Sequence, residues 1–182
     1  MNLKDQLKLS DENYHLLFGV RRSIRYHEYR RNFYQKLHKV TNLFTLLMAG
    51  AVLLDAAKEG ITPDSYVYLG VIAALFAAFD LVIGFASQAN AHGQLRERFA
   101  QLEIDMMTGL DSLELWSDYQ RQRLLIEKDE PAVYHVLNIL CHNELLVSEG
   151  VKQKDNPEAF FKLNVFYRLT RNMCHWENIT SA

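Results

Sequence analysis

A single carboxylate interrupts the longest apolar run of the sequence. Asp80 is the only charged residue between Ser65 and Ala91, a stretch of 27 residues. A carboxylate in the middle of a membrane helix costs roughly 2.5 to 3.5 kcal/mol on insertion scales, so we expect it to face a partner or a water-filled cavity. In an oligomer, a ring of such carboxylates can line a cation path. Structural alternatives stay open: Asp80 is protonated, bonds a hydroxyl on a neighbouring helix, or lies near the cytoplasmic interface.

Histidines and cysteines are the other residues whose types could carry chemistry. Zinc sites usually draw on close ligand pairs such as CxxC or HxxxH, which this sequence lacks. Neighbouring residues of a helix point apart, so the Cys-His dipeptides at Cys141 and Cys174 do not supply that geometry. We therefore predict packing or surface roles for the histidines, with no metal site and no bound cofactor.

Cys141, His142 and Glu144 could be imagined as nucleophile, base and acid, but only their proximity in sequence supports this. The sequence contains no GxSxG, no HExxH and no glycine-rich phosphate loop. We predict no catalytic residue and a protein that is not an enzyme.

Two apolar runs predict a pair of transmembrane helices. Val40–Leu54 is uncharged but spans only about 22 Å of helix, short of the roughly 30 Å hydrocarbon core. The run Ser65–Ala91 is long enough to cross with some tilt. Gly60 is expected to end the first helix, with Thr62 and Pro63 starting the second. Small residues at helical spacing in the second run favour close helix packing: Gly70, Ala74, Ala77 and Gly84.

A basic helix is expected before the first run, beginning at Ser10. Its cations suit a surface beside anionic lipid head groups, although a solvated helix face is the bland alternative. They are Arg21, Arg22, Arg25, Arg30, Arg31, Lys36 and Lys39. The loop between the runs is net acidic, whereas these cations, with Arg96 and Arg98 after the second run, lie at the opposite ends of the hairpin, so the positive-inside rule places both termini in the cytoplasm. The overall net charge of −2 argues against a nucleic-acid partner.

Further helices are predicted after the second run. Apolar residues recur at three- and four-residue steps in a seam formed by Leu95, Phe99, Leu102, Met106, Leu110 and Leu113. This seam would pack on a helix of the same chain or of a neighbouring subunit, and Gly109 could interrupt it. The segment Asp129-Glu130-Pro131 signals another helix, ending at Gly150, and Asn156-Pro157-Glu158 signals a last one.

The predicted fold is therefore all-α, a membrane hairpin of two transmembrane helices flanked by helical regions. Residues 1–39 form an N-terminal interfacial amphipathic helix, residues 40–91 the hairpin, and residues 92–182 a cytoplasmic helical module.

Several short motifs resemble the SLATT family of two-helix membrane proteins. Ser23–Phe33, which contains Tyr26, His27, Arg30 and Arg31, is similar to the stretch before the first membrane helix of that family. Phe79–Phe85 resembles its second helix, and His92–Leu95 the segment that follows. Glu130-Pro131 and Cys141–Leu145 resemble a tail of phage- and prophage-encoded members. The resemblance implies a membrane-disrupting or pore-forming effector in bacterial conflict, including antiviral defence, often triggered by a nucleotide-sensing partner.

Three functions stay open from the sequence. In the leading one, the chain is an oligomeric protein of the bacterial inner membrane that forms or gates an ion channel or lesion. Its expected partners are membrane lipids and a regulatory protein that binds the C-terminal helices. The alternative is a membrane-anchored adaptor, for instance one that excludes superinfecting phage. The third is a soluble helical bundle with two buried apolar helices.

Overall fold

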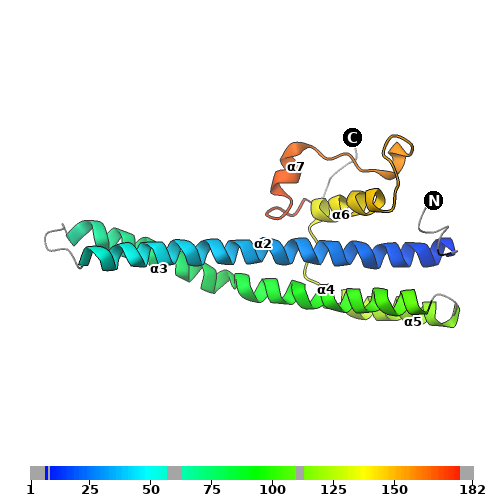
Figure 1. Ribbon diagram of the computed structural model, residues 1–182, viewed down its shortest axis with the longest axis horizontal. Coiled ribbons are helices and arrows are strands. Elements are labelled where there is room, and N and C mark those ends of the chain that lie inside the picture. Colours follow the sequence, from blue (N-terminus) through cyan, green and yellow to red (C-terminus); the bar gives the residue numbers. More distant parts are fainter. Residues whose placement is uncertain (1–6, 8, 57–62, 110–112, 177–182) are drawn as a thin grey trace. The chain divides into compact units, whose positions relative to one another are not determined.

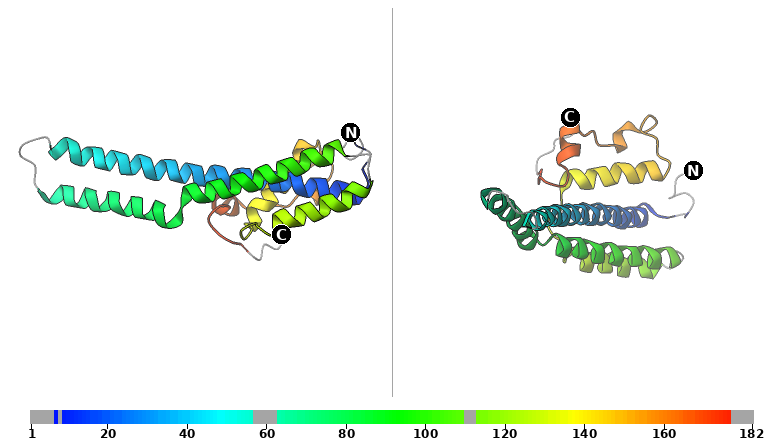
Figure 2. Two further views of the ribbon diagram at one scale, coloured as in Figure 1. Left: turned by 90° about the horizontal axis from the view of Figure 1, so that it is seen from below. Right: turned by 60° about the vertical axis from the view of Figure 1, so that its left-hand side comes forward.

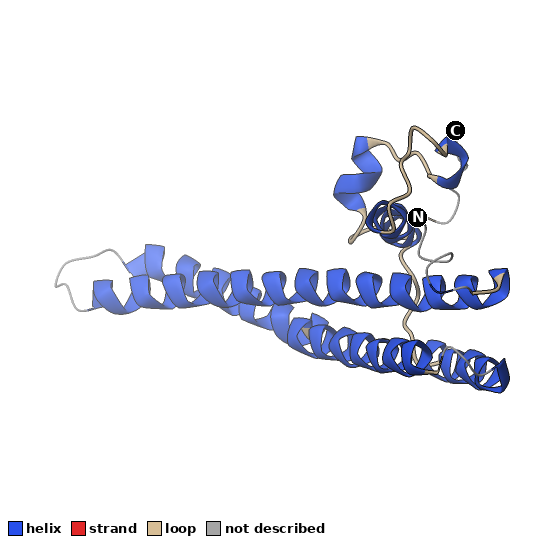
Figure 3. Cartoon of the chain, turned by 45° about the vertical axis from the view of Figure 1, so that its right-hand side comes forward, coloured by secondary structure: helices blue, strands red, loops and turns tan. Residues whose placement is uncertain are grey.

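The computed structural model describes residues 7, 9–56, 63–109 and 113–176, and this part of the chain consists of helices and loops without a strand (Figure 3). The helices, labelled as in Figure 1, are α2 (Asp11–Ala56), α3 (Pro63–Ile83), α4 (Phe85–Thr108), α5 (Leu113–Glu127), α6 (His135–Ser148) and α7 (Val165–Thr170), with a 3-10 turn η1 at Pro157–Ala159. The all-α prediction is confirmed. The predicted turn at Gly60 and Thr62 lies outside the described residues.

The chain divides into two compact units. The first unit comprises residues 1–30 and 92–182, and the second comprises residues 31–91. Both divisions fall inside helices, α2 and α4.

Helix α2 begins where the sequence predicted. The Asn13 amide donates to Ser10 Oγ at 3.2 Å, and the Tyr14 amide donates to the Ser10 carbonyl at 2.9 Å. A serine at this position satisfies an amide that the first turn leaves free. The predicted basic helix and first apolar run form one uninterrupted helix of 46 residues.

The second apolar run is divided, which corrects the prediction of one helix over Ser65–Ala91. Helix α3 ends at Ile83, Gly84 has a φ of +65°, and α4 begins at Phe85. Glycine enters this left-handed region without the steric penalty of a Cβ, so it can end one helix and start the next. The Gly84 amide still donates to the Asp80 carbonyl at 2.8 Å, and the Gln88 amide donates to the Gly84 carbonyl at 2.9 Å.

The first unit has its main core between α2, α4 and α5. The predicted seam supplies four of its buried residues and packs within the same chain, while the side chains of Leu110 and Leu113 lie outside the described residues. Each fully buried leucine contributes roughly 1.5 to 3 kcal/mol of hydrophobic free energy. The core consists of Leu9, Leu16, Leu17 and Val20 from α2 and the residues just before it, Leu95, Phe99, Leu102 and Met106 from α4, and Trp116, Tyr119 and Ile126 from α5.

Another part of α2 packs on α6. Phe18 joins Leu145 and Leu146 in one cluster, and Tyr26 joins Leu137 and Cys141 in another. Helix α6 ends at Ser148, two residues before Gly150, which has a φ of +85°. The helix therefore ends next to the glycine that was predicted to end it.

Two predictions for the C-terminal region were wrong in detail, and one helix was not predicted. The stretch around Glu130 is a connecting segment, and α6 starts only at His135. The Tyr134 amide just before it donates to the Tyr26 hydroxyl at 3.0 Å and not to a carbonyl of an earlier helical turn. The predicted last helix is the turn η1 followed by an extended segment and α7. Helix α5 was not predicted as a separate element; α4 ends at Thr108, just before Gly109.

Candidate functional site

Asp80 has an imidazole partner in the second unit. His38 of α2 places Nδ1 at 2.9 Å from Oδ2 and 3.2 Å from Oδ1 of Asp80 on α3. Nε2 of His38 lies 3.1 Å from the side-chain nitrogen of Asn42, one turn further along α2. The partner is thus an imidazole and not a hydroxyl. An imidazole and a carboxylate at this distance can exchange a proton.

The apolar residues around this pair are exposed within the single chain. Helices α2 and α3 run side by side here (Figures 1 and 2), and the rings of Phe44 and Phe76 stack at 5.7 Å. The outward side chains have few protein neighbours: Leu81 and Val82 are each 84% exposed. In the part of the chain that the structure describes, one helical run, Tyr68–Thr108, is long and apolar enough to cross a membrane, and 6% of its apolar window is buried. The predicted pair of membrane-spanning helices is therefore not confirmed and stays a prediction.

The small residues predicted to pack helices together have few contacts in the chain. Gly70, Ala74 and Ala77 are exposed, and a Cβ built on Gly70 meets no atom within 4 Å. Gly84 is half-buried at the break between α3 and α4. Their role in packing stays a prediction for contacts between chains.

A second, buried polar site lies in the first unit. His27 of α2 is 0% exposed and His92 of α4 is 2% exposed, and their Nδ1 atoms are 2.9 Å apart. Nε2 of His27 lies 3.2 Å from Oε1 of Glu130. The Phe99 ring stacks on His27 at 5.6 Å, which closes the site on its apolar side.

The electrostatics of this site favour a neutral His92. Burial, together with the nearby charges of His27 and Arg30, lowers the pKa of His92 to about 3. Because two Nδ1 atoms share one hydrogen bond, one imidazole donates there and the other accepts.

Three further residues, Tyr26, Arg30 and Tyr134, complete the site. We call it the motif cluster, and it consists of Tyr26, His27, Arg30, His92, Glu130 and Tyr134. The Tyr26 hydroxyl accepts the Tyr134 amide, and burial raises the pKa of Tyr26. Arg30 is 2% exposed, donates to the Asn172 carbonyl at 2.8 Å and lies 3.9 Å from the centre of the Tyr134 ring. The cluster therefore joins α2, α4 and the segment before α6.

The motif cluster does not converge on one point, as a metal site would. The two Nδ1 atoms face each other, whereas Glu130 approaches the opposite nitrogen of His27. The described residues contain no group of three or more His, Cys, Asp or Glu side chains arranged to hold a metal ion.

The predicted lipid-facing cations divide into two sets. Four lie in the first unit: Arg21 donates to Glu103 at 2.6 Å, Arg25 donates to Ser148 at 2.8 Å, Arg22 is half-buried, and Arg30 belongs to the motif cluster. Burial lowers the pKa of Arg22, and the nearby Arg123 lowers it further. The other three, in the second unit, are half-buried Arg31 and exposed Lys36 and Lys39.

Cys141, His142 and Glu144 have separate partners. Cys141 is fully buried, and burial raises the pKa of its thiol to about 12. His142 Nε2 lies 3.2 Å from the Ala159 carbonyl, and Glu144 accepts the Tyr29 hydroxyl at 2.9 Å. A buried thiol with a raised pKa is a poor nucleophile.

Sequence reasoning missed both polar pairs. His38 lies 42 positions from Asp80, and His27 lies 65 positions from His92. The SLATT-like motifs were the available signal, since Tyr26, His27, Arg30, His92 and Glu130 all belong to them and the structure gathers them in one cluster. No family model, curated protein or solved structure matches the chain.

Proposed function

We propose that the protein is an oligomeric protein of the bacterial inner membrane, of the SLATT type, whose α2 and α3 segments form or gate a path for ions. In this proposal lipid and neighbouring subunits cover the apolar side chains of the second unit. The His38–Asp80 pair lies on the conducting path. Both termini are cytoplasmic, and Arg31, Lys36 and Lys39 lie at the lipid surface.

One observation carries the proposal: a histidine–aspartate pair lies among apolar side chains that the chain itself leaves exposed. Val40, Leu43, Leu46 and Leu47 of α2 face outward, as does most of α3 from Tyr68 to Ile83. Exposed apolar surface on this scale marks contact with lipid or protein. Pairing with His38 offsets part of the cost of placing a carboxylate among such residues, and costly intramembrane acids usually serve function.

The test is induced expression in bacteria with a dye that reports membrane potential. The wild type is expected to depolarise the cells, and Asp80→Asn and His38→Gln are expected to reduce that depolarisation. Glu97→Gln is the matched control, because it removes an exposed acid of α4. If the wild type and Asp80→Ala both leave the potential intact at equal membrane abundance, the channel proposal fails.

A membrane-anchored adaptor is the second candidate. It is favoured by the first unit, which has three clusters of buried apolar residues in the described part of the chain and exposed apolar side chains on α7. Exchange of residues 31–91 for an unrelated helical hairpin separates the candidates. An adaptor retains its activity after the exchange, whereas a channel loses it.

The soluble bundle is the least supported candidate. A core helix of a soluble protein is mostly buried, whereas 6% of the apolar window in Tyr68–Thr108 is buried here. Without lipid or a partner, this much exposed apolar surface predicts aggregation.

A further inference from the structure

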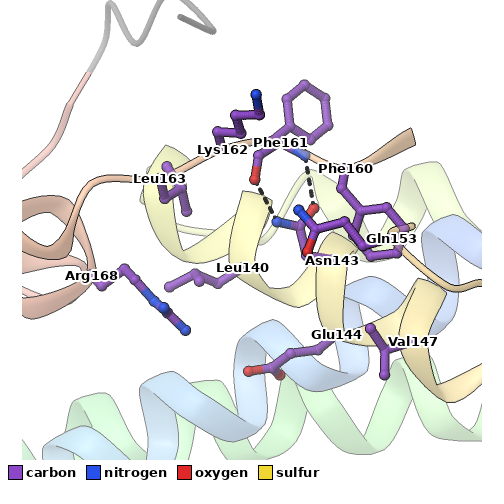
Figure 4. Close-up of a pocket in the computed structure, with 10 residues that line it drawn as sticks. All are labelled: Leu140, Asn143, Glu144, Val147, Gln153, Phe160, Phe161, Lys162, Leu163 and Arg168. Carbon is purple, nitrogen blue, oxygen red and sulfur yellow. Dashed lines mark hydrogen bonds between the residues drawn. The ribbon is translucent and has the colours of Figure 1, made fainter. Parts of the chain in front are cut away.

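A cavity in the first unit has polar groups that the fold itself engages. It measures about 470 Å³ and lies between α6 and the segment before α7. Figure 4 shows at its rim the two hydrogen bonds that join the Asn143 side chain to the backbone of Phe161, at 2.7 and 3.1 Å. Glu144 of the same cavity accepts the Tyr29 hydroxyl at 2.9 Å. These bonds account for Asn143 and Glu144 without a ligand.

The His38–Asp80 pair of the second unit has a defined arrangement of donors and acceptors. The amide nitrogen of the Asn42 side chain lies 3.1 Å from Nε2 of His38. An amide nitrogen only donates, so Nε2 accepts this bond and the neutral ring carries its proton on Nδ1. Nδ1 faces both oxygens of Asp80, at 2.9 and 3.2 Å. The ring therefore donates to the carboxylate at one nitrogen and keeps a lone pair at the other.

Both groups of the pair are open to their surroundings. The side chain of His38 is 35% exposed in the single chain and that of Asp80 is 18% exposed. Histidine gains and loses a proton readily near neutral pH, and its two ring nitrogens can do so separately. Aspartate and histidine inside membranes are typical of proton relays. The pair thus supplies the two groups that a relay needs.

The surroundings of the pair suit a proton better than a metal cation. A sodium or potassium ion must keep its water shell or receive several oxygen ligands in its place. Both Asp80 oxygens already face His38. The large exposed side chains next to Asp80 in α3 are apolar: Phe76, Phe79, Leu81, Val82 and Ile83. A proton needs no such shell, because it passes directly between groups within hydrogen-bond distance.

We propose that the ion carried by the His38–Asp80 pair is the proton; this rests on the proposed function, because it names the ion of that same path. A proton from one side of the membrane binds Nε2 of His38 as the Asn42 amide turns away. The imidazolium gives its Nδ1 proton to the Asp80 carboxylate, and the resulting carboxyl group releases it to the other side. Water then takes the proton left on Nε2 and returns one to Nδ1. One proton crosses in each cycle.

Flux measurements on the full chain in liposomes test the identity of the ion. The liposomes hold a high concentration of potassium and a pH-sensitive dye. With valinomycin, potassium leaves freely and the interior becomes negative, so acidification of the interior reports proton conduction by the protein. With a protonophore in its place, protons cross freely, and loss of potassium reports potassium conduction by the protein. We expect proton flux above the leak of protein-free liposomes, and potassium flux equal to that leak.

Matched variants test whether the protons pass through the pair. Asp80→Asn removes the proton acceptor, and His38→Gln keeps a hydrogen-bond donor for Asp80 but cannot pass a proton on. Each should reduce proton flux to the leak of protein-free liposomes. Glu97→Gln and His15→Gln, which change an exposed acid of α4 and an exposed histidine of α2, should leave the flux unchanged. Circular dichroism and the amount of inserted protein show that each variant is folded.

Each outcome decides the inference. Proton flux without potassium flux, lost in both variants of the pair, supports it. Potassium flux of similar size overturns it and leaves the proposed channel intact. Proton flux that either variant of the pair retains also overturns it, because the protons then take another path. An inserted wild-type chain that carries neither ion overturns the proposed function itself.

Discussion

The stability of the first unit should fall as the pH falls, because His92 is buried in its neutral form. Its pKa in the folded chain is about 3, against an ordinary value of 6.5. Between these values the unfolded chain binds a proton that the folded chain does not, so stability rises with pH in this window. The contribution is complete above about pH 6.5 and is lost progressively as the pH approaches 3. At pH 5 the loss is about 2 kcal/mol relative to pH 8.

The perturbation is His92→Gln, which keeps a hydrogen-bonding side chain opposite His27 but removes the titration. Urea unfolding of the full chain in detergent, followed by the emission of buried Trp116, gives the free energy of unfolding at each pH. Other groups titrate in the same range, so the prediction concerns the difference between wild type and variant. That difference should shrink by about 2 kcal/mol from pH 8 to pH 5. Parallel pH curves for the two proteins would refute the reasoning.

Three further perturbations test other parts of the structure. Tyr26→Phe removes the hydroxyl that accepts the Tyr134 amide and should cost about 1 kcal/mol of unfolding free energy in the same urea assay; an unchanged midpoint would contradict the contact. Gly84→Ala places a Cβ at a φ of +65° and should cost about 1 to 2 kcal/mol, measured by thermal unfolding followed by circular dichroism, or should be neutral if the helix is continuous there. Thiol-reactive dye should label Cys174 in the folded protein and Cys141 only after denaturation, as mass spectrometry would show.

Local signals predicted the local features of the fold. Ser10 marks the start of α2, Gly150 the end of α6, and the seam from Leu95 to Met106 the buried side of α4, because each depends on neighbouring residues alone. Gly84 gave two opposing indications. Its position in an apolar run predicted a continuous helix, whereas glycine is free to adopt a positive φ that ends a helix. In the structure Gly84 has a positive φ, and the helix ends there.

The candidate site could be predicted only in part, since its pairs depend on register between distant segments. Asp80 was identified from the cost of a charge among apolar residues, but its partner His38 follows only when α2 and α3 are aligned. Glu130 was interpreted as a helix start, yet it contacts His27, because the contact between Tyr26 and Tyr134 delays α6. The sequence predicts that Asp80 needs a partner, and the three-dimensional structure identifies His38 as that partner.

Membrane extraction tests the central claim most directly, namely that lipid covers the apolar side chains of α2 and α3 in the second unit. Cells expressing the chain are lysed without detergent, the membranes are collected and washed with alkaline carbonate, and the protein is followed through each step. Our account predicts that the chain stays in the washed membrane pellet and dissolves only with detergent. A chain that stays in the supernatant, monodisperse in buffer alone, would contradict it.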